Sequence, residues 1–449
     1  MKYIILSIIL IFLNSCQEVG DTKPLLENQK EKQPIIIVNK NRHLNIADFW
    51  IDKVKDADKI IMDKEKIQTL NDHIAYQQNL VVNFKDIRKY YNGDSIKDNI
   101  KKSFQHLLKQ TKYFEDGHKI ESDFINEIKE YMNLDTIPKN IKTRYALTVH
   151  YTNQRIIPTQ LALLKKKKQI YFDRNQNSAL DIATPIAILH STKDGKWHYG
   201  IAPTSSGWVR DEDIAFGSRE EIKNYLNSKN FLITTDAKNS ILVGGKYYDY
   251  MRMGVKIPYL LSIDDMNMVL IPNRDENGSL VLTNATIKKA NTHQGYLDYT
   301  PKTILTQAFK FLNYPYGWGG SFGEQDCSKF IQEIYATVGL KLPRNSSSQS
   351  IVGTNHINLT DMSKSTKEEL LNSSSPVGYS IVHLKGHIML YIGEYKGEPY
   401  IIHTVWGESK YNYPLGRTAV TSLNFNNYIN QVDRVTILTL GEDDEEEEE

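Results

Sequence analysis

The sequence is poor in cysteine and in long hydrophobic runs. Among 449 residues there are two cysteines, Cys16 and Cys327. Two thiols exclude a structural zinc site built on cysteine pairs. The most apolar run, residues 4–13, is ten residues long, whereas a helix needs about 20 apolar residues to cross a bilayer. The sequence therefore predicts no transmembrane helix and no cysteine-based metal site.

This short run is typical of an export signal. It follows Lys2 and ends in Leu13-Asn14-Ser15-Cys16, which resembles the processing box of bacterial lipoproteins. The resemblance implies a lipoprotein signal peptide at residues 1–16, lipidation of Cys16, and an exported, membrane-anchored lipoprotein of the bacterial cell envelope. A plain secretory signal with a chance cysteine is the alternative. If Cys16 carries lipid, Cys327 has no cysteine partner and is a candidate reactive thiol.

The charges are nearly balanced overall but unevenly placed. The net charge is +1, although residues 442–449 are all acidic, which predicts a disordered acidic tail at 441–449. The remaining chain is mildly basic, which suits either an anionic polymer or an ordinary solvated surface. We expect no nucleic-acid partner, because the basic run at residues 165–168 is more typical of a solvated turn in an exported protein.

The first half of the chain changes from polar to helical to β-rich. Residues 17–40, with two prolines, indicate a tether. Residues 41–140 carry apolar side chains at helical spacing and predict a helical support domain. Two β-rich stretches follow at 141–217 and 228–297, with short strands and Gly-rich turns. The Gly207-Trp208-Val209 ending of the first resembles a bacterial SH3-like domain, and a second SH3-like barrel is the natural prediction for the other.

The last unit, residues 298–440, surrounds Cys327. A glycine- and aromatic-rich loop precedes this cysteine, and a helical pattern follows it that ends at Gly339. Its predicted buried face consists of Phe330, Ile331, Ile334, Tyr335 and Val338. We expect the helix start to favour an anion and lower the pKa of the Cys327 thiol.

Two histidines are placed to assist that thiol. His387 begins a predicted strand and His403 ends the next, with the turn about midway between them. The two rings should therefore lie close together at the end of the hairpin away from the turn. One ring can take the thiol proton while the other orients it, and the Cys327 amide can serve as an oxyanion donor.

These motifs resemble the NlpC-type cell-wall peptidases, which are papain-like cysteine hydrolases. The resemblance rests on Asp326-Cys327-Ser328, on residues 386–393 beginning Gly-His, and on Ile402-His403. It implies Cys327 as the nucleophile, His387 as general base and acid, and His403 as the orienting residue. With the preceding helical and SH3-like segments, the chain resembles the subgroup that cleaves the γ-D-glutamyl–diamino acid bond of peptidoglycan stem peptides.

The resemblance also implies a substrate site. Tyr316 and Asp326 would hold the free amino end of an L-Ala residue, and Ser328 and Ser346 would lie near the substrate. Two positions depart from the family: Lys329 stands where glycine is usual, and Gly378-Tyr379-Ser380 stands where Gly-Asp-Leu is usual.

The sequence therefore predicts a multidomain protein in which a helical domain and two all-β SH3-like barrels precede an α+β papain-like catalytic domain. Its expected partners are peptidoglycan stem peptides (muropeptides) and, through the lipid anchor, a membrane. No metal or organic cofactor is expected. Two alternatives remain open: a cell-wall amidase or acyltransferase using the same triad, and a non-catalytic cell-wall-binding lipoprotein.

Overall fold

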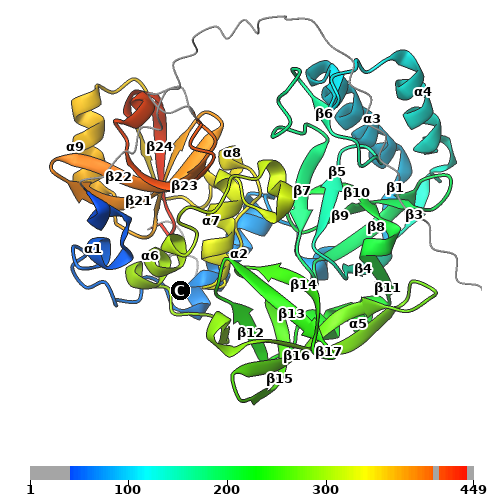
Figure 1. Ribbon diagram of the computed structural model, residues 1–449, viewed down its shortest axis with the longest axis horizontal. Helices are drawn as coiled ribbons and strands as arrows, with labels where there is room; N and C mark the ends of the chain where they lie inside the picture. Colours follow the sequence, from blue (N-terminus) through cyan, green and yellow to red (C-terminus); the bar gives the residue numbers. More distant parts are fainter. Residues whose placement is uncertain (1–40, 408–413, 442–449) are drawn as a thin grey trace, which may run out of the picture. The chain divides into compact units, whose positions relative to one another are not determined.

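The computed structural model describes residues 41–407 and 414–441 (Figure 1). From Arg42 onward the described residues form one compact body. The predicted signal peptide, tether and lipidation site at Cys16 lie outside the described residues. Among the helices within these ranges, none is long and apolar enough to cross a membrane.

The helices that precede the sheets are divided between two hydrophobic cores. They are α1 (Ala47–Ile51), α2 (Lys64–Asp72), α3 (Gly93–Gln110) and α4 (Ser122–Tyr131). Trp50 of α1 and Leu70 of α2 pack in the core of the C-terminal unit, whereas Ile100 of α3 and Ile128 of α4 pack around Trp208 of the first large sheet. The apolar faces of the helices within residues 41–140 are therefore buried against two different neighbours.

The first large sheet is antiparallel and open. Its strands are β4 (Arg144–Thr148), β5 (Thr152–Arg155), β7 (Gln176–Leu180), β8 (Pro185–Ser191), β9 (Trp197–Ile201), β10 (Ser206–Arg210) and β11 (Ile214–Gly217). The order is β11-β4-β8-β9-β10-β5-β7, so the two edge strands are not paired and the sheet is not the closed barrel expected. Two short pairs accompany it: β1 (Tyr90–Asn92) with β3 (Asn140–Lys142), and β2 (Tyr113–Phe114) with β6 (Leu163–Leu164).

The second large sheet follows helix α5 (Arg219–Leu226). Its strands are β12 (Phe231–Thr234), β13 (Lys238–Val243), β14 (Lys246–Arg252), β15 (Lys256–Ile263), β16 (Met266–Arg274), β17 (Leu280–Lys288) and β18 (Thr292–Gln294). It is also open, in the order β14-β13-β17-β16-β15-β12-β18. Ile241, Met251 and Val269 of this sheet pack in a core that also contains Leu147 of the first large sheet and Ile222 of α5.

The C-terminal unit places helices beside a six-stranded sheet (Figure 1). Its helices are α6 (Pro301–Phe309), α7 (Cys327–Ala336), α8 (Ser346–Gln349), α9 (Lys364–Ser374) and α10 (Tyr428–Gln431). Its strands are β19 (His356–Asn358), β20 (Ser380–Leu384), β21 (His387–Tyr395), β22 (Glu398–Val405), β23 (Arg417–Ser422) and β24 (Val432–Ile437). The order is β19-β24-β20-β21-β22-β23. This unit of helices and one sheet follows two β-rich units along the chain, and the multidomain fold class is therefore confirmed.

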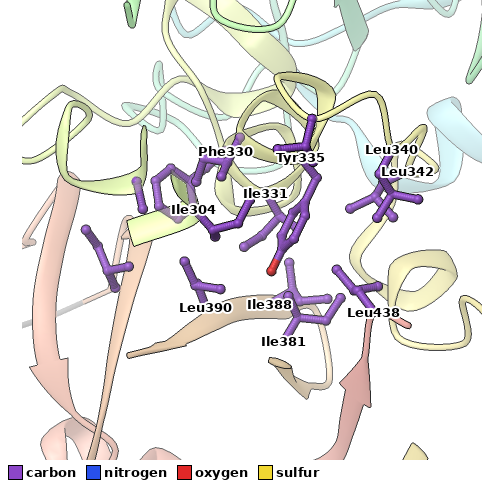
Figure 2. Packing of buried hydrophobic residues seen from close by; sticks show 14 of the residues in the cluster. Ile304, Phe330, Ile331, Tyr335, Leu340, Leu342, Ile381, Ile388, Leu390 and Leu438 are labelled. Carbon is purple, nitrogen blue, oxygen red and sulfur yellow. The ribbon is translucent and has the colours of Figure 1, made fainter. Parts of the chain in front are cut away.

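Helix α7 packs on this sheet through the face that its periodicity predicts. Phe330, Ile331 and Tyr335 point toward Ile388 and Leu390 of β21 (Figure 2). All three α7 side chains are fully buried. Because Cys327 begins the same helix, this packing fixes its position relative to the hairpin formed by β21 and β22.

Candidate active site

Cys327 is the first residue of α7, and Asp326 caps the helix. The Asp326 carboxylate accepts a hydrogen bond from the backbone amide of Lys329 at 2.9 Å. The Cys327 side chain is 8% exposed and belongs to the core cluster that includes Ile388. Since the amides at a helix start have no intrahelical partner, the Cys327 amide can donate to a negatively charged oxygen of a substrate.

The two histidines of the hairpin are hydrogen-bonded to each other. His387 Nε2 lies 2.8 Å from His403 Nδ1, which confirms that the rings lie together. The remaining nitrogen of His403, Nε2, lies 3.1 Å from Oγ1 of Thr421 on β23. With His403 Nε2–H donating to Thr421, His403 Nδ1 accepts from His387 Nε2–H. His387 Nδ1 then carries the lone pair that a general base needs.

The thiol and the imidazole are both neutral in the unliganded protein. Burial, with a smaller contribution from the charge of Asp326, raises the pKa of Cys327 to about 12, and amides of Ile388 and Ser328 only partly offset this. Burial, with a smaller contribution from His383, lowers the pKa of His387 to about 4. The expected lowering of the thiol pKa is therefore wrong, because desolvation outweighs the field of the helix start.

Arg344 holds the carboxylate of Asp326, the residue before Cys327. Its Nη1 and Nη2 lie 3.0 Å and 2.7 Å from Oδ1 and Oδ2 of Asp326, and its Nε donates to Oγ of Ser178 on β7 at 3.0 Å. Burial alone would raise the pKa of Asp326, but the Arg344 guanidinium holds this pKa below its ordinary value. Asp326 is therefore a charged group whose position depends on a residue of the first large sheet.

The other predicted substrate residues differ in how far they are buried. Ser328 is buried, and its hydroxyl donates to Asp326 at 3.2 Å and accepts from Arg344 at 2.9 Å. Tyr316 is half-buried; burial, followed by the charges of Asp326 and Cys327, raises its pKa. Ser346 is half-buried at the start of α8. Asp326 and Ser328 flank Cys327 in the chain and are hydrogen-bonded to each other, and Tyr316 lies within electrostatic range of Asp326 and Cys327.

The glycine-rich loop before Cys327 is attached to the first large sheet. Tyr151 donates to the Gly320 carbonyl at 2.9 Å, and Gln176 donates to the Gly319 carbonyl at 3.1 Å. Gly320 has φ +86°, and a Cβ there would lie 2.6 Å from Cβ of Ala179. Glycine is therefore required both by the left-handed backbone and by the close approach. The Gly319 amide then donates to Asp326 at 3.1 Å, which links the loop to the helix cap.

Aromatic side chains surround Tyr316 on its other sides. The ring of Trp406 lies 6.1 Å from that of Tyr316 and 4.6 Å from that of Tyr171. Phe172 lies 5.5 Å from Trp318, centroid to centroid. Tyr171 and Phe172 belong to the segment that precedes β7, so side chains from two different units form this aromatic wall beside the site.

Lys329 connects α7 to the first large sheet. Its Nζ lies 3.2 Å from Asp181 and 3.9 Å from Glu333, one turn further along α7. Glu333 in turn lies 3.0 Å from Nη2 of Arg252, a fully buried residue of β14. At the position where glycine is usual in NlpC-type peptidases, this chain therefore has a cation that joins α7 to its neighbours.

Three residues of the site have little signal in the sequence. Arg344 lies in the Leu-Pro-Arg loop after α7, and only its position after that helix could have suggested proximity to Asp326. Thr421 and Ser178 are ordinary strand residues whose roles depend on pairing between distant strands. Among the described residues, no group of His, Cys, Asp or Glu side chains has the arrangement of a metal site.

Comparisons with known proteins identify two parts of the chain. Residues 313–414 match the NlpC/P60 family, and residues 163–210 match an SH3 domain of the SH3b1 type. The chain is 36% identical over 64 residues to the bifunctional muramidase/DL-endopeptidase CwlT of Bacillus subtilis (strain 168). This match spans 14% of the chain and about a fifth, 19%, of that protein.

A solved structure extends the likeness to most of the fold. The NlpC/P60 endopeptidase from Photobacterium damselae subsp. piscicida aligns with a TM-score of 0.72 and 23% identity, over 87% of this chain and 97% of that one. At this identity the likeness concerns the fold. The C-terminal unit that carries Cys327 and the two histidines is an NlpC/P60 domain. The chain combines this domain with an SH3 domain of the SH3b1 type.

Proposed function

We propose that this protein is a cysteine endopeptidase that hydrolyses the γ-D-glutamyl–diamino acid bond of peptidoglycan stem peptides. The observation that supports this most strongly is the hydrogen-bonded chain from His387 through His403 to Thr421. The residue after His387, Ile388, makes a backbone hydrogen bond to the buried thiol of Cys327, so the chain begins close to that thiol. The presence of an NlpC/P60 domain agrees with the proposal.

The proposed reaction begins from a neutral pair. As the Cys327 sulfur adds to the scissile carbonyl carbon, His387 Nδ1 takes the thiol proton. The carbonyl oxygen becomes an oxyanion near the Cys327 amide. Collapse of this intermediate breaks the C–N bond, and the imidazolium gives its proton to the leaving amine of the diamino acid. The thioester is then hydrolysed by a water molecule that His387 deprotonates, which restores the thiol.

His403 and Thr421 would contribute by fixing the proton on His387. The bond from His387 Nε2–H to His403 keeps the opposite nitrogen, Nδ1, unprotonated, and the Thr421 bond keeps His403 in the accepting tautomer. The imidazolium formed during reaction is buried, so its bond to His403 also stabilises the new charge.

We place the free N-terminal L-Ala of the substrate at Tyr316 and Asp326. A carboxylate favours an ammonium group over a blocked amine. Because Arg344 already pairs with Asp326, the ammonium gains less from this carboxylate than an isolated aspartate would provide. Tyr316, which is half-buried, supplies a second polar contact. Ser328 would act through Asp326, and Ser346 is proposed to border the substrate.

One experiment can test both the bond that is cleaved and the preference for a substrate with a free N-terminal amine. Purified protein is incubated with L-Ala-γ-D-Glu-diaminopimelate and with its N-acetylated form, and the products are identified by mass. We expect release of diaminopimelate from the free peptide and much slower release from the acetylated one. Asp326→Asn should narrow the difference between the two peptides. Equal rates on both peptides with the unaltered protein would contradict the role proposed for Asp326.

We further propose export and anchoring through lipidated Cys16. The motif Leu13-Asn14-Ser15-Cys16 carries this part of the proposal. Incorporation of a labelled fatty acid into the protein in bacterial cells, and its loss in Cys16→Ala, would support it. Labelling that persists in Cys16→Ala would contradict it.

A further inference from the structure

A cavity lies against α7, and neither the thiol of Cys327 nor the histidines of the hairpin line it. It has a volume of about 790 Å³, and α7 contributes Lys329, Gln332, Glu333 and Ala336 to its wall. The other walls come from residues 81–85, the end of β7 and the turn that follows it, α5, and residues 253–256. Its size falls within the range of about 300–1,000 Å³ typical of ligand sites.

The acidic side chains of this cavity already have cationic partners. Asp181 pairs with Lys329 at 3.2 Å, and Glu220 lies 3.7 Å from Lys223. Glu333 pairs with Arg252, which lies outside the cavity lining, at 3.0 Å. The negative charge of the lining is therefore largely neutralised within the protein.

Among the described residues, three further lysines of the lining lack a carboxylate partner; Lys85 hydrogen-bonds instead to Tyr76, and Lys256 Nζ lies 4.4 Å from the centroid of the Phe231 ring. Lys85, Lys256 and Lys341 form no ion pair in the part of the chain that the structure describes. Lys256 donates to the Leu226 carbonyl at 3.0 Å, an uncharged acceptor. Burial and then the charge of Lys341 lower the pKa of Lys256. Burial is also the largest cause of the lowered pKa of Lys341, where Lys85 acts in the same direction and Asp72 opposes it.

The cavity also has apolar surface beside these lysines. Val81, Met253 and Leu340 contribute to the lining, and Tyr296 provides an aromatic ring. Lys341 repels Lys256, Lys85 repels Lys341, and an anion placed between these lysines relieves the repulsion. An apolar or peptidic body attached to the anion would occupy the remaining wall.

We propose that this cavity is a binding site for a small anionic ligand with two or more carboxylate or phosphate groups, held by Lys85, Lys256 and Lys341. Carboxylate groups could come from an acidic peptide, and phosphate groups from a phosphate ester. This ligand would contact α7, the helix that begins with Cys327. It would not occupy the proposed substrate site.

The test measures binding rather than turnover, so its result is independent of the proposed peptidase activity. Calorimetric titrations at low ionic strength would use three probes: citrate, inorganic phosphate and the dipeptide L-Ala-D-Glu. We expect at least one probe to bind with one-to-one stoichiometry. The double variant Lys256→Gln/Lys341→Gln should weaken that binding by about tenfold or more, because it removes two of the three cations that would hold the anion.

The matched control is Lys288→Gln/Lys289→Gln, which removes the same charge from exposed positions at the end of β17. It should bind the probe as the unaltered protein does, and circular dichroism would verify that each variant is folded. If the double variant unfolds, Lys341→Gln alone takes its place. Preferential binding of phosphate would identify a phosphate-bearing ligand, and preferential binding of citrate or the dipeptide a carboxylate ligand. No saturable binding of any probe, or equal affinity in the cavity variant and the control, would overturn the proposal.

Discussion

Arg344 and Asp326 form a two-pronged ion pair, at 3.0 Å and 2.7 Å, immediately next to Cys327. The pair is almost entirely buried, and Ser178 and Ser328 complete its hydrogen bonds. The carboxylate that precedes Cys327 is therefore held by Arg344 of a loop in the C-terminal unit, and Arg344 is held in turn by Ser178 of the sheet that contains the SH3 match. This arrangement makes the site depend on how the two units meet.

Replacing Arg344 by lysine should destabilise the protein and slow the reaction. Lysine keeps the charge but cannot reproduce the planar, two-pronged contact with Asp326. Loss of a partner from a buried pair costs about 3–5 kcal/mol, so we expect Arg344→Lys to lose up to that much in the free energy of unfolding. Urea unfolding measures this loss. The exposed Arg417→Lys is the control and should be neutral; equal stability of the two variants would show that the pair contributes little.

Thr421→Val should lower kcat/KM without unfolding the protein. Valine has nearly the shape of threonine but cannot accept the proton of His403 Nε2, so His403 is no longer held in the accepting tautomer. One such hydrogen bond contributes about 0.5–1.5 kcal/mol, which corresponds to a reduction of up to about tenfold. The comparison is with Thr360→Val, at an exposed position away from the histidines. Similar kcat/KM values for both variants would remove Thr421 from the mechanism.

The decrease of kcat/KM on acidification should occur at an unusually low pH. The base must be unprotonated, and burial lowers the pKa of His387 from 6.5 to about 4. Activity should therefore persist below pH 6 and fall as the pH approaches 4, with no loss between pH 7 and 9, because the pKa of Cys327 is raised to about 12. An acid limb centred between pH 6 and 7 would contradict the neutral, desolvated imidazole.

The lowered pKa of His387 also predicts that the free energy of unfolding decreases in acid. The folded-state pKa of His387 lies below the unfolded value, so the unfolded chain binds a proton at a pH where the native protein does not. The contribution of the neutral ring is fully present above pH 6.5 and is lost as the pH falls from about 6.5 toward 4. Urea unfolding at a series of pH values measures the free energy of unfolding. Over this interval it should decrease less steeply in His387→Phe than in the unaltered protein. Parallel curves for the two proteins would refute this contribution.

Lys329 and Asp181 should be coupled in a double-mutant cycle. Each single change, Lys329→Met or Asp181→Asn, leaves a charged partner with little exposure, since both side chains are 11% exposed. The single variants should each lose roughly 3 kcal/mol or less, because Glu333 and the Arg252 amide remain as partners. The double variant should be more stable than the sum of the two losses predicts. Strict additivity would show that the ion pair does not couple α7 to the first large sheet.

The parts of the site that depend on local periodicity could be predicted from the sequence. The helix after Cys327, its buried face through Phe330 and Tyr335, and the proximity of His387 to His403 all follow from residue spacing within one helix or one hairpin. The structure confirms each of them.

The remaining features depend on tertiary contacts and on burial. Arg344 reaches Asp326 and Ser178 only after the loop, helix and sheet are assembled, and no spacing in the sequence encodes that meeting. The pKa of the thiol was expected to fall because a helix start is visible in sequence, whereas the desolvation of Cys327 is not. The division of residues 41–140 between two cores has the same origin, because periodicity shows which face of a helix is buried but not against what.

The measurement that tests the central claim most directly is digestion of L-Ala-γ-D-Glu-diaminopimelate by the unaltered protein and by Cys327→Ala, with products identified by mass. The account predicts that the unaltered protein releases diaminopimelate and that Cys327→Ala, folded to the same degree by circular dichroism, releases none above the uncatalysed background. Release by Cys327→Ala at the rate of the unaltered protein would contradict Cys327 as the nucleophile, and no cleavage by either protein would contradict the proposed substrate.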